Sequence, residues 1–106
     1  FGVTKDLNKS FEWYEKSAKL GHSTAMNNLG SCYYNGEGCD ENETKAFEWY
    51  EKSAKLGYSA AMFNVGDCYK DGKGVTKDLN KAKEWYIKAA AQGDEDAQAA
   101  LDELNQ

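Results

Sequence analysis

The sequence predicts an all-α solenoid built from antiparallel helix pairs. One eleven-residue segment, FEWYEKSAKLG, occupies residues 11–21 and returns unchanged at residues 47–57. The chain has no proline, and its ten glycines fall at recurring positions, so glycine marks the turns. A fixed period of this length indicates a repeat array in which each unit is one helix pair. The tryptophans keep the same spacing of 36 residues, at Trp13, Trp49 and Trp85.

The repeated segment itself has the pattern of an amphipathic helix. In ETKAFEWYEKSAKLG, Ala46, Tyr50 and Ala54 lie at positions i, i+4 and i+8, on one helical face. Asn42 precedes this run, where a short polar side chain can cap the first N–H groups, and Gly57 follows it, where a positive φ is easily adopted. We call these segments B helices and expect them near residues 7–20, 43–56 and 79–92.

A second amphipathic segment follows each B helix. In SAAMFNVGDCYKDG, Ala61, Val65 and Tyr69 again share one face, with Ser59 expected as the N-cap and Gly72 as the stop. We call these segments A helices and expect them near residues 23–35, 59–71 and 94–105.

The order of the segments is B, A, B, A, B, A, which gives six helices and about three repeats, the first of them incomplete. Gly30 and Gly66 lie inside A helices, where each costs about 1 kcal/mol relative to alanine. We therefore expect a neighbouring helix to approach closely at both positions. A single pair cannot bury its apolar face alone, so residues 1–106 are expected to form one stacked array.

The repeat unit has the pattern A-x-x-x-L-G-x-x-Y-x-x-G-x-G-V-x-x-D-x-x-K-A-x-x-W-Y-x-K-A-A-x-x-G. This pattern resembles the Sel-one-like repeat family, a relative of the tetratricopeptide repeats, over the whole chain. The resemblance implies an α-solenoid whose A helices line a concave wall and which serves as an adaptor for other proteins. The matching positions in one unit include Ala61, Val65, Gly66, Tyr69, Gly72, Gly74, Val75, Asp78, Trp85 and Gly93.

The two ends of the array differ in character. The last A helix has Asp102 where the earlier copies have glycine, as expected for the polar C-terminal end of an array. At the other end, an upstream A helix is expected to be missing. We therefore expect the first B helix to expose apolar surface at Phe11, Tyr14 and Ala18, and the chain to self-associate there as a homo-oligomer.

Function is expected where the repeats differ, on the A helices beside their apolar stripe. By resemblance to tetratricopeptide arrays, these positions line the concave groove and bind a protein or peptide partner. Asn28 and Asn64 have a second interpretation, in which they brace an A–B pair by hydrogen bonds. The predicted partner-binding residues are Asn27, Asn28, Ser31, Tyr34, Phe63, Asn64, Asp67 and Lys70.

These observations favour a non-enzymatic interaction scaffold within a larger signalling or regulatory protein. One alternative is a weak β-lactam-hydrolysing enzyme, which some cysteine-rich bacterial relatives are reported to be. Another is a structural spacer or self-association module attached to a catalytic domain such as a kinase.

Composition excludes several other classes. The net charge of −5 argues against a nucleic-acid partner, and no apolar stretch is long enough to span a bilayer. His22 is the only histidine and is expected to be exposed. No cofactor, metal or catalytic residue is therefore expected.

The three cysteines point to a reducing compartment. Cys32 and Cys68 are equivalent residues on successive A helices, too far apart for a disulfide, whereas Cys32 and Cys39 could meet across a turn. A periplasmic group of the family pairs cysteines at the positions held here by Ala18 and Met26. We expect a cytoplasmic location, with the endoplasmic-reticulum lumen or an extracytoplasmic site as the alternative.

Overall fold

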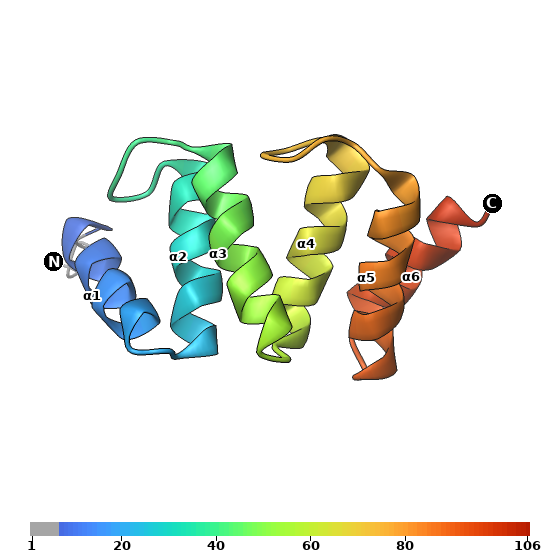
Figure 1. Cartoon of the computed structure of the whole chain (residues 1–106), viewed down its shortest axis with the longest axis horizontal. Coiled ribbons are helices and arrows are strands. Elements are labelled where there is room, and N and C mark those ends of the chain that lie inside the picture. The colour runs from blue at the N-terminus through green and yellow to red at the C-terminus, as the bar shows by residue number, and fades with distance from the viewer. Residues whose placement is uncertain (1–6) are drawn as a thin grey trace, which may run out of the picture.

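Six α-helices lie side by side in chain order in the computed structural model, which describes residues 7–106 (Figure 1). No strand is found among these residues, so the predicted all-α repeat architecture is confirmed. Each helix begins and ends within one residue of its predicted bounds. The helices are α1 (Leu7–Lys19), α2 (Ser23–Asn35), α3 (Glu43–Lys55), α4 (Ser59–Asp71), α5 (Leu79–Ala91) and α6 (Glu95–Leu104).

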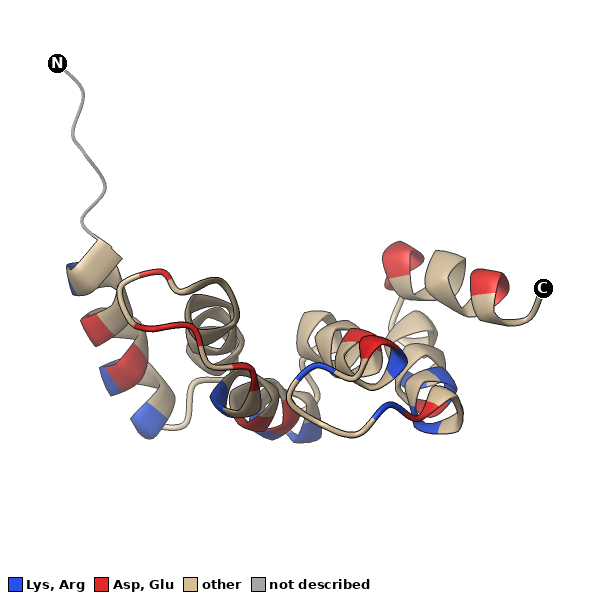
Figure 2. Ribbon diagram, turned by 90° about the horizontal axis from the view of Figure 1, so that it is seen from above, with Lys and Arg blue, Asp and Glu red and all other residues tan. Residues whose placement is uncertain are grey.

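The helices form two layers. Seen from above, the A helices α2, α4 and α6 make one layer and the B helices α1, α3 and α5 make the other (Figure 2). The last helix, α6, turns away from α5 toward the side of the A layer. The array measures 47 × 31 × 24 Å, so it is elongated along the row of helices, as a stack of repeats must be.

Alanines allow the helices to pack closely. Ala46, Ala61, Ala82 and Ala97 are wholly buried at the contacts between successive helices. Larger side chains fill the space around them, and Tyr86 is the largest fully buried side chain. A continuous core results from α3 to α6, and a smaller apolar cluster lies between α1 and α2.

The two glycines inside A helices are sites of close approach, as predicted. A Cβ atom on Gly30 would lie 2.7 Å from Cδ1 of Tyr50, and one on Gly66 would lie 2.6 Å from Cε1 of Tyr86. Since neither ring has room to move in a packed interior, Tyr50 and Tyr86 each require glycine on the preceding A helix.

Polar side chains cap several helices. Asn42 accepts a hydrogen bond from the backbone N–H of Lys45 at 3.0 Å, as predicted, and Asp78 and Asp94 cap α5 and α6 in the same way. The prediction for Ser59 is wrong, because this residue is already the first residue of α4. Tyr58 holds the N-cap position there and makes no side-chain cap hydrogen bond.

Each G-x-G loop reaches back across the array to the preceding B helix. In the second loop, a Cβ atom on Gly74 would overlap the backbone carbonyl oxygen of Glu43, the first residue of α3. Gly38 makes the equivalent approach to the backbone of Leu7 in α1. Both glycines have positive φ, of 73° at Gly74 and 77° at Gly38. The loops are therefore turns that join neighbouring repeats, and each of them follows a helix.

Candidate interaction surfaces

Five of the predicted partner-binding residues form what we call the A-layer surface. All five are partly exposed and come from α2 and α4. They are Ser31, Tyr34, Phe63, Asp67 and Lys70.

The A-layer surface is held from behind by two buried tyrosines of the B helices. The ring of Tyr34 lies 6.5 Å from that of Tyr50, and the ring of Phe63 lies 5.8 Å from that of Tyr86. Hydrogen bonds add to this support. The hydroxyl of Tyr50 shares one of 3.0 Å with the hydroxyl of Ser31. The exposed aromatic rings therefore rest on fixed partners rather than moving freely in solvent.

One repeat later, Asp67 occupies the position of Ser31 and places a carboxyl group there. The hydroxyl of Tyr86 donates to a carboxylate oxygen of Asp67 at 2.5 Å. Burial raises the pKa of Asp67, while the hydrogen bond from Tyr86 and the charge of Lys70 act in the opposite direction. Burial also raises the pKa of Tyr86, and it raises that of Tyr50 to about 12, so both phenols stay protonated at neutral pH.

The asparagines behave differently from the rest of the predicted set. Asn27 is only 8% exposed, so the expectation that it contacts a partner is wrong. Its side-chain oxygen accepts a hydrogen bond of 2.9 Å from Asn64, which joins α2 to α4. The bracing interpretation of Asn64 therefore applies, but between two A helices rather than within an A–B pair. Asn28 lies apart from this pair, in a pocket between α1 and α2.

The side chains exposed on the face of α1 predicted for self-association are not all the expected ones. Ala18 is 1% exposed because it packs with Ala25 and Leu29 of α2, so its predicted exposure is wrong. Phe11 packs edge-on against Tyr33 at 5.5 Å, and Tyr14 is partly exposed. The large apolar side chains exposed in or next to α1 are those of Leu7, Trp13 and Leu20, and Trp13 is 67% exposed. The exposure of Trp13 could not be predicted from the sequence, because Trp13 and Trp49 lie in identical segments. Self-association through this face stays a prediction.

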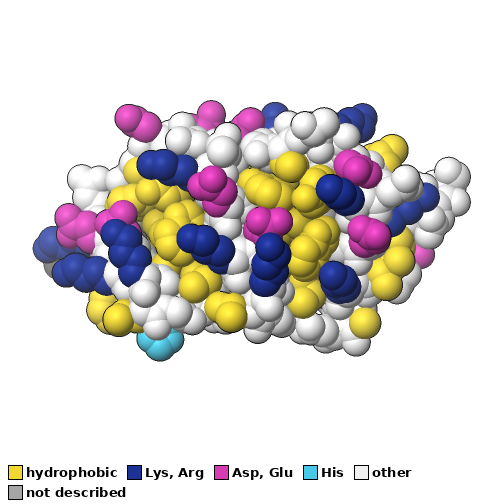
Figure 3. Space-filling model, in the orientation of Figure 1, with side chains coloured by type: hydrophobic (Ala, Val, Ile, Leu, Met, Phe, Trp, Pro, Cys, Tyr) yellow, Lys and Arg dark blue, Asp and Glu magenta, His cyan; other side chains and the backbone are white. Residues whose placement is uncertain are grey.

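The outer face is formed by the B helices. Hydrophobic side chains there lie between many Lys, Asp and Glu side chains (Figure 3). The ammonium group of Lys52 lies 4.5 Å from the centre of a Trp49 ring, and that of Lys88 lies 4.4 Å from a Trp85 ring. These lysines partly cover the tryptophans in a cation–π arrangement, and they break up the apolar area of this face.

No disulfide joins the three cysteines, all of which lie within the described residues. The thiol of Cys39 donates to the backbone oxygen of Cys32 at 3.6 Å, so the pairing across the turn is not formed. Burial raises the pKa of the Cys39 thiol, and it raises that of Cys68 to about 12.

We expect the thiols to react with iodoacetamide in a fixed order. Cys39 is half-buried, whereas Cys68 is buried, and a thiol must be deprotonated and accessible to react. At pH 8, Cys39 should be alkylated first and Cys68 only when the chain unfolds. Mass spectrometry of peptides over time measures this, and equal rates for the two cysteines would contradict the burial of Cys68.

No group of three or more His, Cys, Asp or Glu side chains within residues 7–106 is arranged to hold a metal ion. His22, the N-cap residue of α2, is exposed as predicted. None of the helices in this described part is long and apolar enough to cross a membrane.

The 36-residue helix pair agrees with a known family. The model of the Sel1 repeat matches residues 1–22, 23–58 and 59–94. The chain belongs to the Sel1 repeat family. Each complete Sel1 match combines an A helix with the following B helix, and α6 lies beyond the matched residues. Sel1 repeats are generally protein–protein interaction modules.

Solved Sel1 structures share this fold. The chain is 42% identical to a Sel1 repeat protein from Oxalobacter formigenes, with a TM-score of 0.84, over 87% of this chain and 69% of that one. It is 37% identical to c5321, a protective antigen of uropathogenic Escherichia coli with an SLR fold (TM-score 0.85), over 87% of this chain but only 20% of that one. Cysteine rich protein B of Helicobacter pylori is 29% identical (TM-score 0.86), over 92% of this chain and 73% of that one. No relative was found among curated proteins.

Proposed function

We propose that this Sel1 array is a non-enzymatic scaffold that binds an extended segment of a protein partner across its A-layer surface. The supporting observation is the pair of partly exposed rings, Tyr34 and Phe63, held by the buried Tyr50 and Tyr86. Rings that are already ordered lose little conformational entropy on binding, which is why aromatic anchors dominate many interfaces.

Polar groups beside the rings can orient a bound peptide on the surface. Asp67 accepts one hydrogen bond from Tyr86 and retains further acceptor capacity for a partner N–H. Lys70 lies one helical turn further along α4 and can bind a carbonyl or carboxylate. An extended peptide presents alternating side chains and free backbone groups, which suit two apolar contacts flanked by one acceptor and one donor.

We further propose that the array acts within a larger signalling or regulatory protein, in a reducing compartment such as the cytoplasm. Cys32, Cys39 and Cys68 form no disulfide with one another, which supports the compartment. No residue is assigned a catalytic role in this proposal.

Selection of displayed random peptides on the immobilised chain tests the scaffold proposal. For a selected peptide, the double variant Tyr34→Ala/Phe63→Ala should bind about tenfold or more weakly, because it removes both aromatic anchors. The matched control is Glu48→Ala/Glu84→Ala, which changes two exposed residues of the B helices and should leave the affinity unchanged.

Phe63 also packs against the core, so circular dichroism must show that the double variant is folded. Lys70→Glu offers a second variant without that complication, and it should weaken binding of the same peptide. If the double variant and Lys70→Glu both bind like the original chain, the A-layer surface is not the binding site.

A further inference from the structure

Asp67 and Lys70 place two opposite charges on the A-layer surface, and neither belongs to an ion pair. The ion pairs within residues 7–106 join other side chains. Burial raises the pKa of Asp67 and the charge of Lys70 acts in the opposite direction, so the two groups influence one another without forming an ion pair. Both side chains are partly buried. A partly buried charge that lacks a counter-ion is stabilised when a partner supplies one.

Phe63 stands in line with these two charges on α4. Phe63, Asp67 and Lys70 lie at positions i, i+4 and i+7, on one face of the helix. At a rise of about 1.5 Å per residue, they follow one another at intervals of about 6 Å and about 4.5 Å along the axis. Tyr86 fixes the first two, because its ring packs against that of Phe63 at 5.8 Å and its hydroxyl donates to Asp67. Along α4, the A-layer surface therefore presents an apolar, an acidic and a basic group in a fixed order.

The pair of opposite charges is peculiar to α4 among the three A helices. One repeat earlier, Ser31 and Tyr34 of α2 occupy the two charged positions. One repeat later, Glu103 and Gln106 stand there. Since α2 packs in the array with uncharged residues at both positions, the pair is not needed to hold the repeats together.

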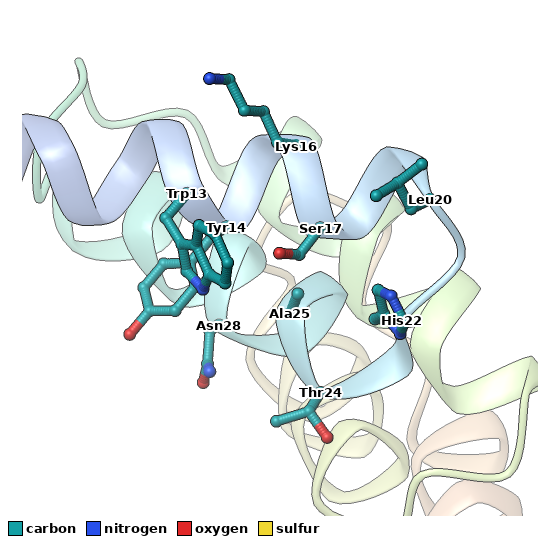
Figure 4. A pocket seen from close by; sticks show the side chains of 9 residues that line it. All are labelled: Trp13, Tyr14, Lys16, Ser17, Leu20, His22, Thr24, Ala25 and Asn28. Atoms are coloured by element: carbon teal, nitrogen blue, oxygen red, sulfur yellow. The ribbon is translucent and has the colours of Figure 1, made fainter.

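The open pocket between α1 and α2, of about 520 Å³, has a different chemistry (Figure 4). Trp13 and Tyr14 lie there beside Asn28. Among the lining residues in the described part of the chain, Lys16 is the only Lys, Asp or Glu. The pocket therefore offers no pair of opposite charges, and binding that depends on both signs reports on the A-layer surface.

A bound segment changes the surroundings of Asp67 and Lys70 because it displaces water from both. A neutral hydrogen-bond donor would leave the charge of the Asp67 carboxylate uncompensated. A Lys or Arg side chain instead supplies the opposite charge together with a charge-assisted hydrogen bond. By the same argument, an Asp or Glu side chain is the matching group for Lys70.

We propose that the partner segment carries an apolar, a basic and an acidic residue in this order, at alternate positions of an extended chain. The apolar residue contacts Phe63, the basic residue contacts Asp67 and the acidic residue contacts Lys70. Alternate side chains of an extended chain point to the same side at intervals of about 6.6 Å, close to the spacing of the three groups on α4. This inference rests on the proposed function, because it specifies the partner of the same surface.

Display libraries with a fixed core test the order of the charges. One library has the core Leu-x-Arg-x-Glu, a second has Leu-x-Glu-x-Arg and a third has Leu-x-Gln-x-Gln, with all other positions random. Binders to the immobilised full chain should come mainly from the first library. The second library has the same composition, but it places like charges together when its leucine contacts Phe63, so its binders should be rare.

Two charge variants of the chain connect the binders to particular residues. Asp67→Asn keeps the shape of the side chain and an acceptor for Tyr86, and it should weaken a peptide from the first library about three- to tenfold. Lys70→Glu should weaken the same peptide to a similar extent, and changing the glutamate of the peptide to lysine should restore the affinity. Glu48→Gln and Lys83→Glu are the matched controls, because they change the net charge by the same amounts on the B helices and should leave the affinity unchanged.

The outcomes separate this inference from the proposed function. Suppose that the three libraries yield binders equally, and that these lose affinity for Tyr34→Ala/Phe63→Ala but not for Asp67→Asn. The A-layer surface then binds peptides without reading their charges, so the proposed function stands and this inference is wrong. Binders that neither the double variant nor Lys70→Glu weakens would overturn both. The absence of binders in the first library, or a lysine peptide that fails to restore binding to Lys70→Glu, would also overturn this inference.

Discussion

Gly74→Ala should lower the free energy of unfolding by about 2–4 kcal/mol, as measured by urea denaturation. The residue has φ of 73°, where an alanine costs about 1–2 kcal/mol. The new Cβ atom would also overlap the carbonyl oxygen of Glu43, which is backbone and cannot rotate away. The loop must therefore move off α3, and the contact between neighbouring repeats weakens.

Gly72→Ala is the matched control for this substitution. Gly72 lies in the same loop with φ of 70°, but a Cβ atom there would be 3.4 Å from its nearest neighbour, Cβ of Lys77. The alanine variant at this position has the backbone strain without the overlap. Its free energy of unfolding should therefore fall by only about 1 kcal/mol. Equal losses for the two variants would show that the approach of the loop to α3 contributes nothing.

Tyr86→Ala should cost about 3–5 kcal/mol, the range measured for truncating buried aromatic side chains. Tyr86 is 0% exposed, packs on Gly66 and donates to Asp67, so the variant loses ring burial and leaves a carboxylate without its donor. Thermal denaturation followed by circular dichroism measures the change. Tyr86→Phe keeps the ring and should lose about 1–2 kcal/mol for the lost hydrogen bond.

Tyr14→Ala is the control for Tyr86→Ala, because Tyr14 holds the equivalent position in the first B helix. Tyr14 is partly exposed and lines the open pocket, so its truncation should cost clearly less than that of Tyr86. A result in which Tyr14→Ala destabilises the chain as much as Tyr86→Ala would mean that the pocket is closed in solution.

Much of the fold could be predicted because the repeats constrain one another. The period locates six helices, and the recurring glycines inside the A helices, Gly30 and Gly66, correctly indicate close helix contacts. The N-cap at Asn42 follows from local chemistry alone. Ser59 shows the limit of such reasoning, because capping residues and first-turn residues have overlapping compositions.

The surface was harder to predict because exposure depends on neighbours in space. Trp13 and Trp49 occur in identical eleven-residue segments, yet Trp13 is 67% exposed and Trp49 packs against the cluster between α1 and α2. Asn27 looked like a groove residue, but Asn64 one repeat later buries it. In both cases, contacts between successive repeats determine how exposed the side chain is. The local sequence does not show which of these contacts form.

The sparse anchoring of α6 and α1 affects how the array unfolds. Only Ala97 of α6 is buried, and α1 at the other end of the row buries only Ala18, whereas α4 buries six residues. In a linear array, a terminal helix can open while the interior stays folded. Within residues 7–106, both end helices are therefore weakly anchored and the middle is firm, so force, heat or a protease should open α1 and α6 before α4.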